Sequence, residues 1–200
     1  MICIRKNRRG FTLVEMVLSL AIISIIFGLT TTLVVCVRNS FMSTYNLNDS
    51  SDYAVLYGSG FENSILSHTQ NRVSGKWYIS NNILTCSGTP VFVPDHLQTR
   101  QKDSETIVDK WNIAMYFNYT ESSSRVRYIV CVTDNYYNPG KLIYTYSSMV
   151  WLPHFADTKL ATPQGTIKVS DIQTGVLDPE DSEHKTKLTD YGTTIEYTAP

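Results

Sequence analysis

The sequence predicts an α+β protein, in which a long membrane-spanning α-helix at the N-terminus packs against an antiparallel β-sheet. Three observations support this prediction. A short basic head opens the chain, an apolar run follows it from residue 11 to residue 37, and beyond residue 75 apolar residues alternate with the two-residue period of β-strands. Two hundred residues suit one anchor and one external domain.

The apolar run has the length of a transmembrane helix. As a helix, the segment 16–37 would be about 33 Å long, which matches the roughly 30 Å hydrocarbon core of a bilayer. The head, residues 1–10, carries four basic side chains and no acidic one. Basic residues before a first span tend to remain in the cytoplasm, so we expect a single crossing with the rest of the chain outside.

The head also differs from a secretory signal peptide. In a signal peptide the apolar region is about 7 to 15 residues long and is followed by a small-x-small cleavage site. Residues 33–39 offer no such site, and the residue that could mark a cleavage site, Gly10, lies before the apolar run. Cleavage there would remove the charged head and leave the span in place.

Glu15 is the only charged residue between Phe11 and Val37. A carboxylate within a span costs on the order of 2.5 to 3.5 kcal/mol and usually has a partner. Glu15 could reach the headgroups from one turn inside the span. Alternatively, it pairs with a group on another chain, for which the best candidate is the new amine that cleavage creates on Phe11.

The hexapeptide Gly-Phe-Thr-Leu-Val-Glu at residues 10–15, followed by an apolar helix, resembles the N-terminal signature of the type IV pilin superfamily. The resemblance implies that a prepilin peptidase cleaves after Gly10 and methylates the amine of Phe11. It also implies that Glu15 neutralises the Phe11 amine of a neighbouring subunit during filament assembly. Many pilins have a proline midway through this helix, whereas this sequence has none before Pro90.

By the same resemblance, the protein is a structural subunit of a type IV pilus or a related filament, either a minor pilin or a pseudopilin. Its partners would be the prepilin peptidase, other pilin subunits, an inner-membrane assembly platform and the cytoplasmic membrane. Two alternatives remain open: a minor pilin at a filament tip that binds DNA, a surface or a secreted substrate, and an uncleaved single-span protein. The sequence does not distinguish a pilus from a type II secretion pseudopilus or a competence filament.

The chain divides into four expected segments. These are a cleaved basic leader at 1–10, a transmembrane and filament-core helix at 11–37, the outer half of the helix at 38–67, and an external β-rich domain at 68–200. In the outer half, one helical stripe is apolar and should pack against the domain; it consists of Phe41, Met42, Tyr45, Tyr53, Leu56 and Tyr57. The alternative is a helix that stops at Gly58.

Eight strands are expected in the external domain. They lie at 77–79, 83–86, 91–93, 113–119, 126–132, 142–146, 166–169 and 193–197. The pairs Asn81-Asn82 and Ser87-Gly88 are typical of turns. The three longest strands form an antiparallel meander with one apolar face, which the outer half of the helix is available to cover.

Two of the four cysteines, Cys86 and Cys131, fall in the external domain, while Cys3 belongs to the head and Cys36 to the outer end of the span. The alternation places Cys131 on the polar face of its strand, where a free thiol would be exposed. Outside the cytoplasm a pair can oxidise. The sequence therefore leaves open a disulfide between Cys86 and Cys131 or two unpaired apolar residues.

No pattern of catalytic residues stands out, so we predict a protein without enzyme activity and without a cofactor. The four histidines are scattered and none lies at metal-ligand spacing; they are His68, His96, His154 and His184. Some pseudopilins carry calcium in a C-terminal loop, but the acidic run 178–184 fits no defined calcium loop. We interpret it as a solvated loop and expect no metal.

Charge and aromatic content bear on the binding alternatives. Removal of the head leaves 13 basic and 18 acidic side chains, a net charge of −5, which argues against a general nucleic-acid binder. Tyr136 and Tyr137 fall in a turn and could form an exposed aromatic contact. Tyrosines in such a sequence more often fill a sheet and its interface with a helix.

Overall fold

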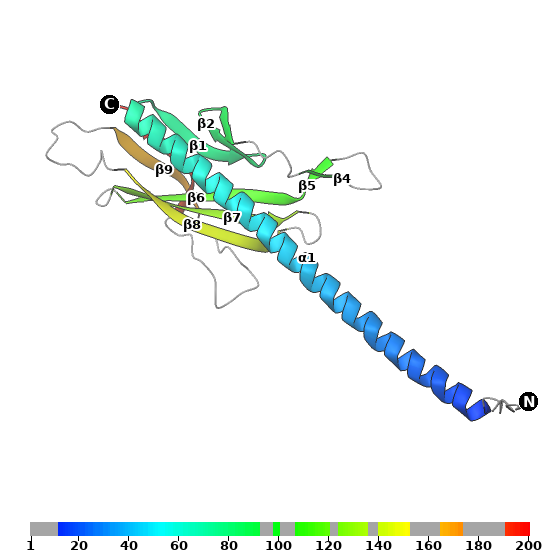
Figure 1. Ribbon diagram of the computed structural model, residues 1–200. Coiled ribbons are helices and arrows are strands. Elements are labelled where there is room, and N and C mark those ends of the chain that lie inside the picture. Colours follow the sequence, from blue (N-terminus) through cyan, green and yellow to red (C-terminus); the bar gives the residue numbers. More distant parts are fainter. Residues whose placement is uncertain are drawn as a thin grey trace, which may run out of the picture. The chain divides into compact units, whose positions relative to one another are not determined.

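The structure is a computed structural model, which describes residues 12–92, 98–100, 107–120, 124–135, 140–152, 165–173 and 191–200. The chain divides into two compact units, an N-terminal unit, Met1–Asn46, and a C-terminal unit, Leu47–Pro200. One long apolar helix and a curled antiparallel sheet make up the described part of the chain, so the predicted α+β, pilin-like architecture is confirmed (Figure 1).

The helix α1, Leu13–Asn71, is continuous. It passes through Gly58, so the alternative of a helix that stops there is wrong, and it ends four residues beyond the expected Ser67. At its end the amide of Val73 donates to the carbonyl of His68 at 2.9 Å, and Arg72 adopts a φ of 54°. This is the Schellman arrangement, with an arginine at the position that glycine usually occupies.

Each of the expected strands is present, but β8 and β9 extend five and four residues beyond their expected ends, and two short strands were not expected, β4 and β5. Their bounds are β1 Gly75–Ser80, β2 Ile83–Cys86, β3 Thr89–Phe92, β4 Gln98–Arg100, β5 Ile107–Asp109, β6 Trp111–Thr120, β7 Arg125–Asp134, β8 Leu142–Trp151, β9 Thr166–Gln173 and β10 Tyr191–Thr198. Asn81-Asn82 and Ser87-Gly88 all have positive φ, as two-residue hairpin turns of type I′ require.

Eight strands form one antiparallel sheet in the order β3-β2-β1-β10-β6-β7-β8, with β9 paired to β10. The strands β4 and β5 pair separately. The predicted meander is β6-β7-β8, in which all ten residues of β6 pair with β7. The last strand of the chain, β10, connects this meander to the β1-β2-β3 hairpins, because it pairs with both β1 and β6.

Within the C-terminal unit, α1 covers one face of the sheet (Figure 1). Its buried residues follow helical spacing and are Ser50, Ala54, Tyr57, Gly58, Phe61, Ile65 and Thr69. The ring of Phe61 lies at the centre of the core, with its centroid 4.9 Å from that of Phe117 and 5.2 Å from that of Tyr128. Apolar burial at about 25 cal/mol per Å² is the dominant stabilising term for such a helix on a sheet.

The predicted apolar stripe of the outer helix is only partly correct. Tyr57 is buried in the core and Tyr53 packs against it, but Leu56 is exposed, and so are Phe41, Met42 and Tyr45 of the N-terminal unit. The residues that meet the sheet include small ones, Ser50, Ala54 and Gly58, that a search for large apolar side chains overlooks. Where the helix approaches the sheet closely, a small side chain is what the packing needs.

The other face of the sheet is less polar than the alternation predicted. Ile129 and Cys131 are buried there, with Ala114, Tyr116, Leu142 and Tyr191 packed against them. The expectation that the Cys131 thiol would be exposed is therefore wrong, because only 2% of the residue is accessible.

Candidate functional site

The N-terminus of α1 is capped by two residues of the predicted signature, Thr12 and Glu15. The hydroxyl of Thr12 accepts a bond from the amide of Glu15 at 3.3 Å, while the amide of Thr12 donates to Oε2 of Glu15 at 2.9 Å. The Thr12 hydroxyl also donates to the same oxygen at 2.9 Å. This reciprocal pattern is a capping box, with Thr12 as the N-cap and Glu15 three residues into the helix.

Both bonds from Thr12 end on Oε2 of Glu15. Among the described residues, no donor reaches the other oxygen, Oε1. The carboxylate can therefore cap its own helix and still accept a hydrogen bond from a second chain. Neither alternative in the sequence analysis included this local role for Glu15, although Thr-x-x-Glu before an apolar run is a recognised signal.

The apolar part of α1 that follows is exposed over its whole described length in the N-terminal unit. Its large side chains include Leu13, Val17, Ile23, Phe27, Leu33 and Val37, each more than half accessible. By length and composition, α1 can cross a membrane. A surface of this kind needs lipid or another protein to cover it.

The hydroxyl groups along this segment are satisfied within the helix. Ser19 donates to the carbonyl of Glu15 at 2.7 Å, Ser24 to that of Leu20 at 2.8 Å, and Thr31 to that of Phe27 at 2.8 Å. Thr30 and Thr32 bond in the same way. Because a bilayer interior offers no water to unpaired polar groups, this internal bonding suits the segment to an apolar environment.

The two predicted processing residues, Gly10 and Phe11, lie outside the described residues. Tyr136, Tyr137 and the acidic run 178–184 lie outside them too. Their predicted roles stay predictions. Three of the four histidines fall there as well, which leaves His68 as the one the structure describes.

Comparison with known proteins addresses the N-terminal motif directly. Residues 5–31 match the prokaryotic N-terminal methylation motif. The chain carries the hallmark of type IV prepilin-like proteins. No curated protein and no solved structure matches the chain.

The two cysteines of the C-terminal unit are not brought together. Cys86 lies on the face of the sheet that α1 covers, and Cys131 lies on the opposite face. Both are free thiols in the structure. A disulfide would need their Cβ atoms within about 4.5 Å on the same side of the sheet, so this fold keeps them as two buried apolar residues.

Burial also sets the acidity of these thiols. It raises the pKa of the Cys131 thiol to about 12, with no other cause. Burial is the main reason that the pKa of Cys86 is raised as well. A raised pKa keeps the thiol protonated and poorly nucleophilic, which does not favour a catalytic role for either residue.

The one described histidine contacts Cys86. Its Nε2 lies 3.5 Å from the sulfur, and its Nδ1 lies 2.9 Å from the carbonyl oxygen of Ser64. Because a carbonyl can only accept, Nδ1 carries the hydrogen and a neutral His68 ring offers Nε2 to the thiol. Trp77 completes this cluster by donating its indole N–H to the Ser64 hydroxyl at 2.9 Å. Among the residues that the structure describes, no cluster of three metal-ligating side chains occurs.

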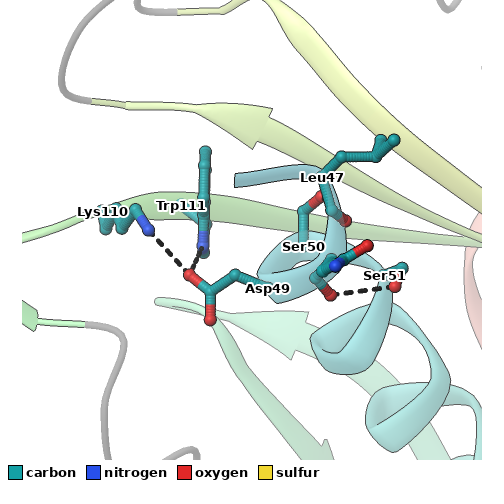
Figure 2. Close-up of polar contacts among 7 residues, drawn as sticks. Leu47, Asp49, Ser50, Ser51, Lys110 and Trp111 are labelled. Atoms are coloured by element: carbon teal, nitrogen blue, oxygen red, sulfur yellow. Dashed lines mark hydrogen bonds and ion pairs between the residues drawn. The ribbon is translucent and has the colours of Figure 1, made fainter. Parts of the chain in front are cut away.

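A polar contact joins the beginning of the C-terminal unit's helix to the sheet (Figure 2). Lys110 Nζ lies 2.7 Å from Oδ2 of Asp49, and the indole N–H of Trp111 donates to the same oxygen at 3.2 Å. The Lys110 ammonium also lies 4.5 Å from the centroid of the Trp111 ring. Sequence reasoning missed this contact, because 61 residues separate Asp49 from Lys110.

Asn82 connects the β1–β2 turn to the same region. Its side-chain amide donates to Asp109 at 2.7 Å and to the carbonyl of Trp111 at 3.2 Å, and its oxygen accepts from the amide of Ile113 at 2.8 Å. Its backbone carbonyl accepts from the hydroxyl of Tyr57. These contacts connect the helix, the turn and the sheet. A hydrogen-bond network of this kind stabilises the fold and does not form a binding site.

Proposed function

We propose that this protein is a structural subunit of a type IV pilus or related filament, in the role of a minor pilin or pseudopilin. It is processed by prepilin peptidase after Gly10, methylated at Phe11 and assembled through its N-terminal helix. The observation that supports this most directly is the methylation motif at 5–31, which runs into an exposed apolar helix with one carboxylate in its first turn.

Before assembly, the proposed subunit waits in the cytoplasmic membrane with its N-terminus cytoplasmic and its C-terminal unit external. The basic head supports this orientation, because positive residues favour the cytoplasmic side. An inner-membrane assembly platform would then pass it to a filament at the cell surface. We propose no enzymatic activity for it.

In the filament, side chains of neighbouring subunits would replace lipid around the apolar segment of α1. Transfer from lipid to protein leaves Glu15 as the only charge of the described segment 12–37, and an unpaired carboxylate in such surroundings is costly. The methylated amine of Phe11 in a neighbouring subunit would supply the opposite charge. Oε1 of Glu15 is the oxygen that can accept it while Oε2 caps the helix.

The first experiment is mass spectrometry of the protein purified from its own host membranes. It measures the mass of the intact chain and the mass of its N-terminal peptide. A chain that begins at Phe11 and is one methyl group heavier than calculated is the expected result. A chain that still begins at Met1 would contradict the proposal and favour the uncleaved single-span alternative.

Two sets of variants separate processing from assembly. Gly10→Ala, or a bulkier residue there, should slow cleavage and leave a longer chain on gels of membrane fractions. Glu15→Val should insert into the membrane but enter sheared filaments poorly.

Glu15→Gln is the matched control, since glutamine can still complete a capping box while the charge is lost. Equal incorporation of Glu15→Gln and wild type would show that the charge of Glu15 is not the assembly contact.

A further inference from the structure

We infer that the C-terminal units of adjacent subunits contact one another through two complementary surfaces. One is the basic strand surface, made of Arg125, Arg127, Met149 and Trp151; the other is the acidic helix surface, made of Asp52, Val55 and Leu56. The inference rests on the proposed function as a filament subunit and names a subunit contact for the C-terminal unit.

The basic strand surface lies at the β7–β8 end of the sheet, on the face opposite α1. Arg125 pairs directly with Trp151 across the two strands, and Arg127 pairs with Met149. Side chains in such pairs lie roughly 5 Å apart at their Cβ atoms, and the two rows are about 6.6 Å apart along the strand. Trp151 is 58% exposed and Met149 is 52% exposed.

This surface is positively charged and has no acidic side chain in its two rows. On β6 the residues opposite Arg125 and Arg127 are Thr120 and Asn118, which are neutral. Within the described part of the chain, neither guanidinium takes part in an ion pair. Exposed tryptophan, methionine and arginine together have the composition of a protein interface, where these residue types are enriched.

The acidic helix surface lies on the side of α1 that faces away from the sheet. Val55 and Leu56 follow Asp52 at three and four residues, so the three side chains are neighbours on the helix. Val55 is 45% exposed and Leu56 is 47% exposed. Asp52 is exposed too, and within the described residues its carboxylate has no ion pair or hydrogen bond.

The two surfaces match in chemistry. Each has two exposed large apolar side chains beside a charge, and the charges are opposite. Six large apolar residues of the C-terminal unit are exposed in the described chain, and four of them belong to these two surfaces; the six are Leu47, Val55, Leu56, Val73, Met149 and Trp151. A second copy of the chain presents both surfaces, so it can bury the apolar residues and pair the charges at once.

The placement of the surfaces also determines the kind of assembly. They are different patches on opposite sides of the C-terminal unit, one on the sheet and one on the helix. A contact between them is heterologous, so each subunit can bind one neighbour on either side. Contacts of this kind that do not close into a ring produce open fibres.

A charge exchange tests the contact in the full-length protein, expressed in its own host in place of the wild-type copy. Asp52→Arg and Arg127→Asp should each lower the amount of subunit in sheared filaments at least about tenfold, because the first variant opposes positive charges across the interface and the second cancels the net positive charge of the basic strand surface. The double variant, which restores opposite charges, should recover incorporation to within about threefold of wild type. Lys141→Glu is the matched control, because Lys141 is an exposed charge just before the start of β8 and outside both surfaces, and it should assemble normally.

Cross-linking provides an independent measurement. With Cys36 replaced by serine, Leu56→Cys and Met149→Cys in one chain should give a ladder of disulfide-linked multimers in oxidised filaments. Either substitution alone should give none. A ladder would require a contact between different surfaces, since a symmetric contact stops at dimers.

The outcomes separate the inference from the proposed function. Normal incorporation of both single charge variants, or no recovery in the double variant together with no ladder, would overturn the inference while wild-type filaments keep the proposed function intact. Absence of wild-type protein from every sheared filament fraction would overturn both. Membrane level and processing of each variant, compared with wild type, show whether a loss comes from folding or from the contact.

Discussion

The carboxylate of Asp49 and the ammonium of Lys110 are 2.7 Å apart, and they join the first turn of the C-terminal unit's helix to the start of β6. The same carboxylate oxygen accepts the indole N–H of Trp111, a residue that is 1% exposed. Three of the helix residues that follow, Ala54, Tyr57 and Phe61, are fully buried against the sheet. The pair therefore fixes where the helix begins to pack.

Replacement of Asp49 by alanine should lower the free energy of unfolding by about 1 to 3 kcal/mol, because it leaves the buried Trp111 indole without its acceptor. Loss of the ion pair alone would cost less, since partly exposed pairs contribute at most about 1 kcal/mol. Chemical denaturation of the full chain in detergent measures the change. Asp52→Ala, one turn away and exposed, should change the stability by no more than about 0.5 kcal/mol. Equal stability of the two variants would show that the Asp49 contact contributes nothing.

Two helical glycines should respond in opposite directions to alanine. A Cβ at Gly58 would lie 2.8 Å from the hydroxyl of Tyr128 and 2.8 Å from a ring carbon of Tyr146. Tyr128 cannot easily move away, because its hydroxyl donates to Glu62 at 2.6 Å. Gly58→Ala should therefore destabilise the protein by about 1 to 3 kcal/mol.

Gly60 is the matched control for this effect. The atom nearest to a Cβ there is 3.5 Å away, which is ordinary contact. Gly60→Ala should stabilise the helix by up to about 1 kcal/mol, the difference in helix propensity between the two residues. Thermal unfolding followed by circular dichroism compares the variants, and a stabilising Gly58→Ala would contradict the close approach of α1 to β7 and β8.

The strands with one buried face were predictable from the sequence, and those with two were only partly so. Alternation located β6 and β7, because Ile113, Met115, Phe117, Val126 and Tyr128 face the helix. It failed for the centre of β7, where five consecutive residues from Tyr128 to Val132 are buried. Burial on both faces removes the two-residue period on which the prediction depends.

The candidate site was predictable to the extent that its signals are local. The Gly-Phe-Thr-Leu-Val-Glu signature and the apolar run lie in one stretch of sequence, so both were recognised. The Asp49–Lys110 pair and the pairing of β10 with β1 and β6 depend on residues far apart in the chain. Nothing in a single sequence specifies such long-range contacts, and the inferred basic strand surface likewise depends on the register between β7 and β8.

Thr12 should control fraying of the N-terminus of α1. Thr12→Ala removes the acceptor for the amide of Glu15, and loss of an N-cap costs about 1 kcal/mol. Hydrogen exchange of that amide in micelles should then be about fivefold faster, since 1.4 kcal/mol corresponds to a factor of ten. Thr12→Ser keeps the hydroxyl and should exchange at nearly the wild-type rate; an alanine variant as well protected as the serine one would show that the capping box does not hold the first turn.

The buried thiol of Cys131 makes stability depend on pH at alkaline values. Burial raises the pKa of Cys131 from 9.0 to about 12, so the folded state retains a proton that the unfolded state releases earlier. The stabilising contribution is complete below pH 9 and is lost as the pH rises from about 9 to about 12. It cannot exceed about 4 kcal/mol, at 1.36 kcal/mol for each pKa unit.

Comparison with Cys131→Ala isolates this contribution from the buried tyrosines, whose pKa values are also raised. The stability difference between wild type and Cys131→Ala should shrink between pH 9 and pH 11, because only the wild type loses the thiol's contribution. Alkylation at pH 8 gives a second test: Cys131 should react only after denaturation, since the thiolate is the nucleophile. Rapid alkylation of Cys131 in the folded protein, or a difference in stability that does not change with pH, would show that this face of the sheet is open to solvent.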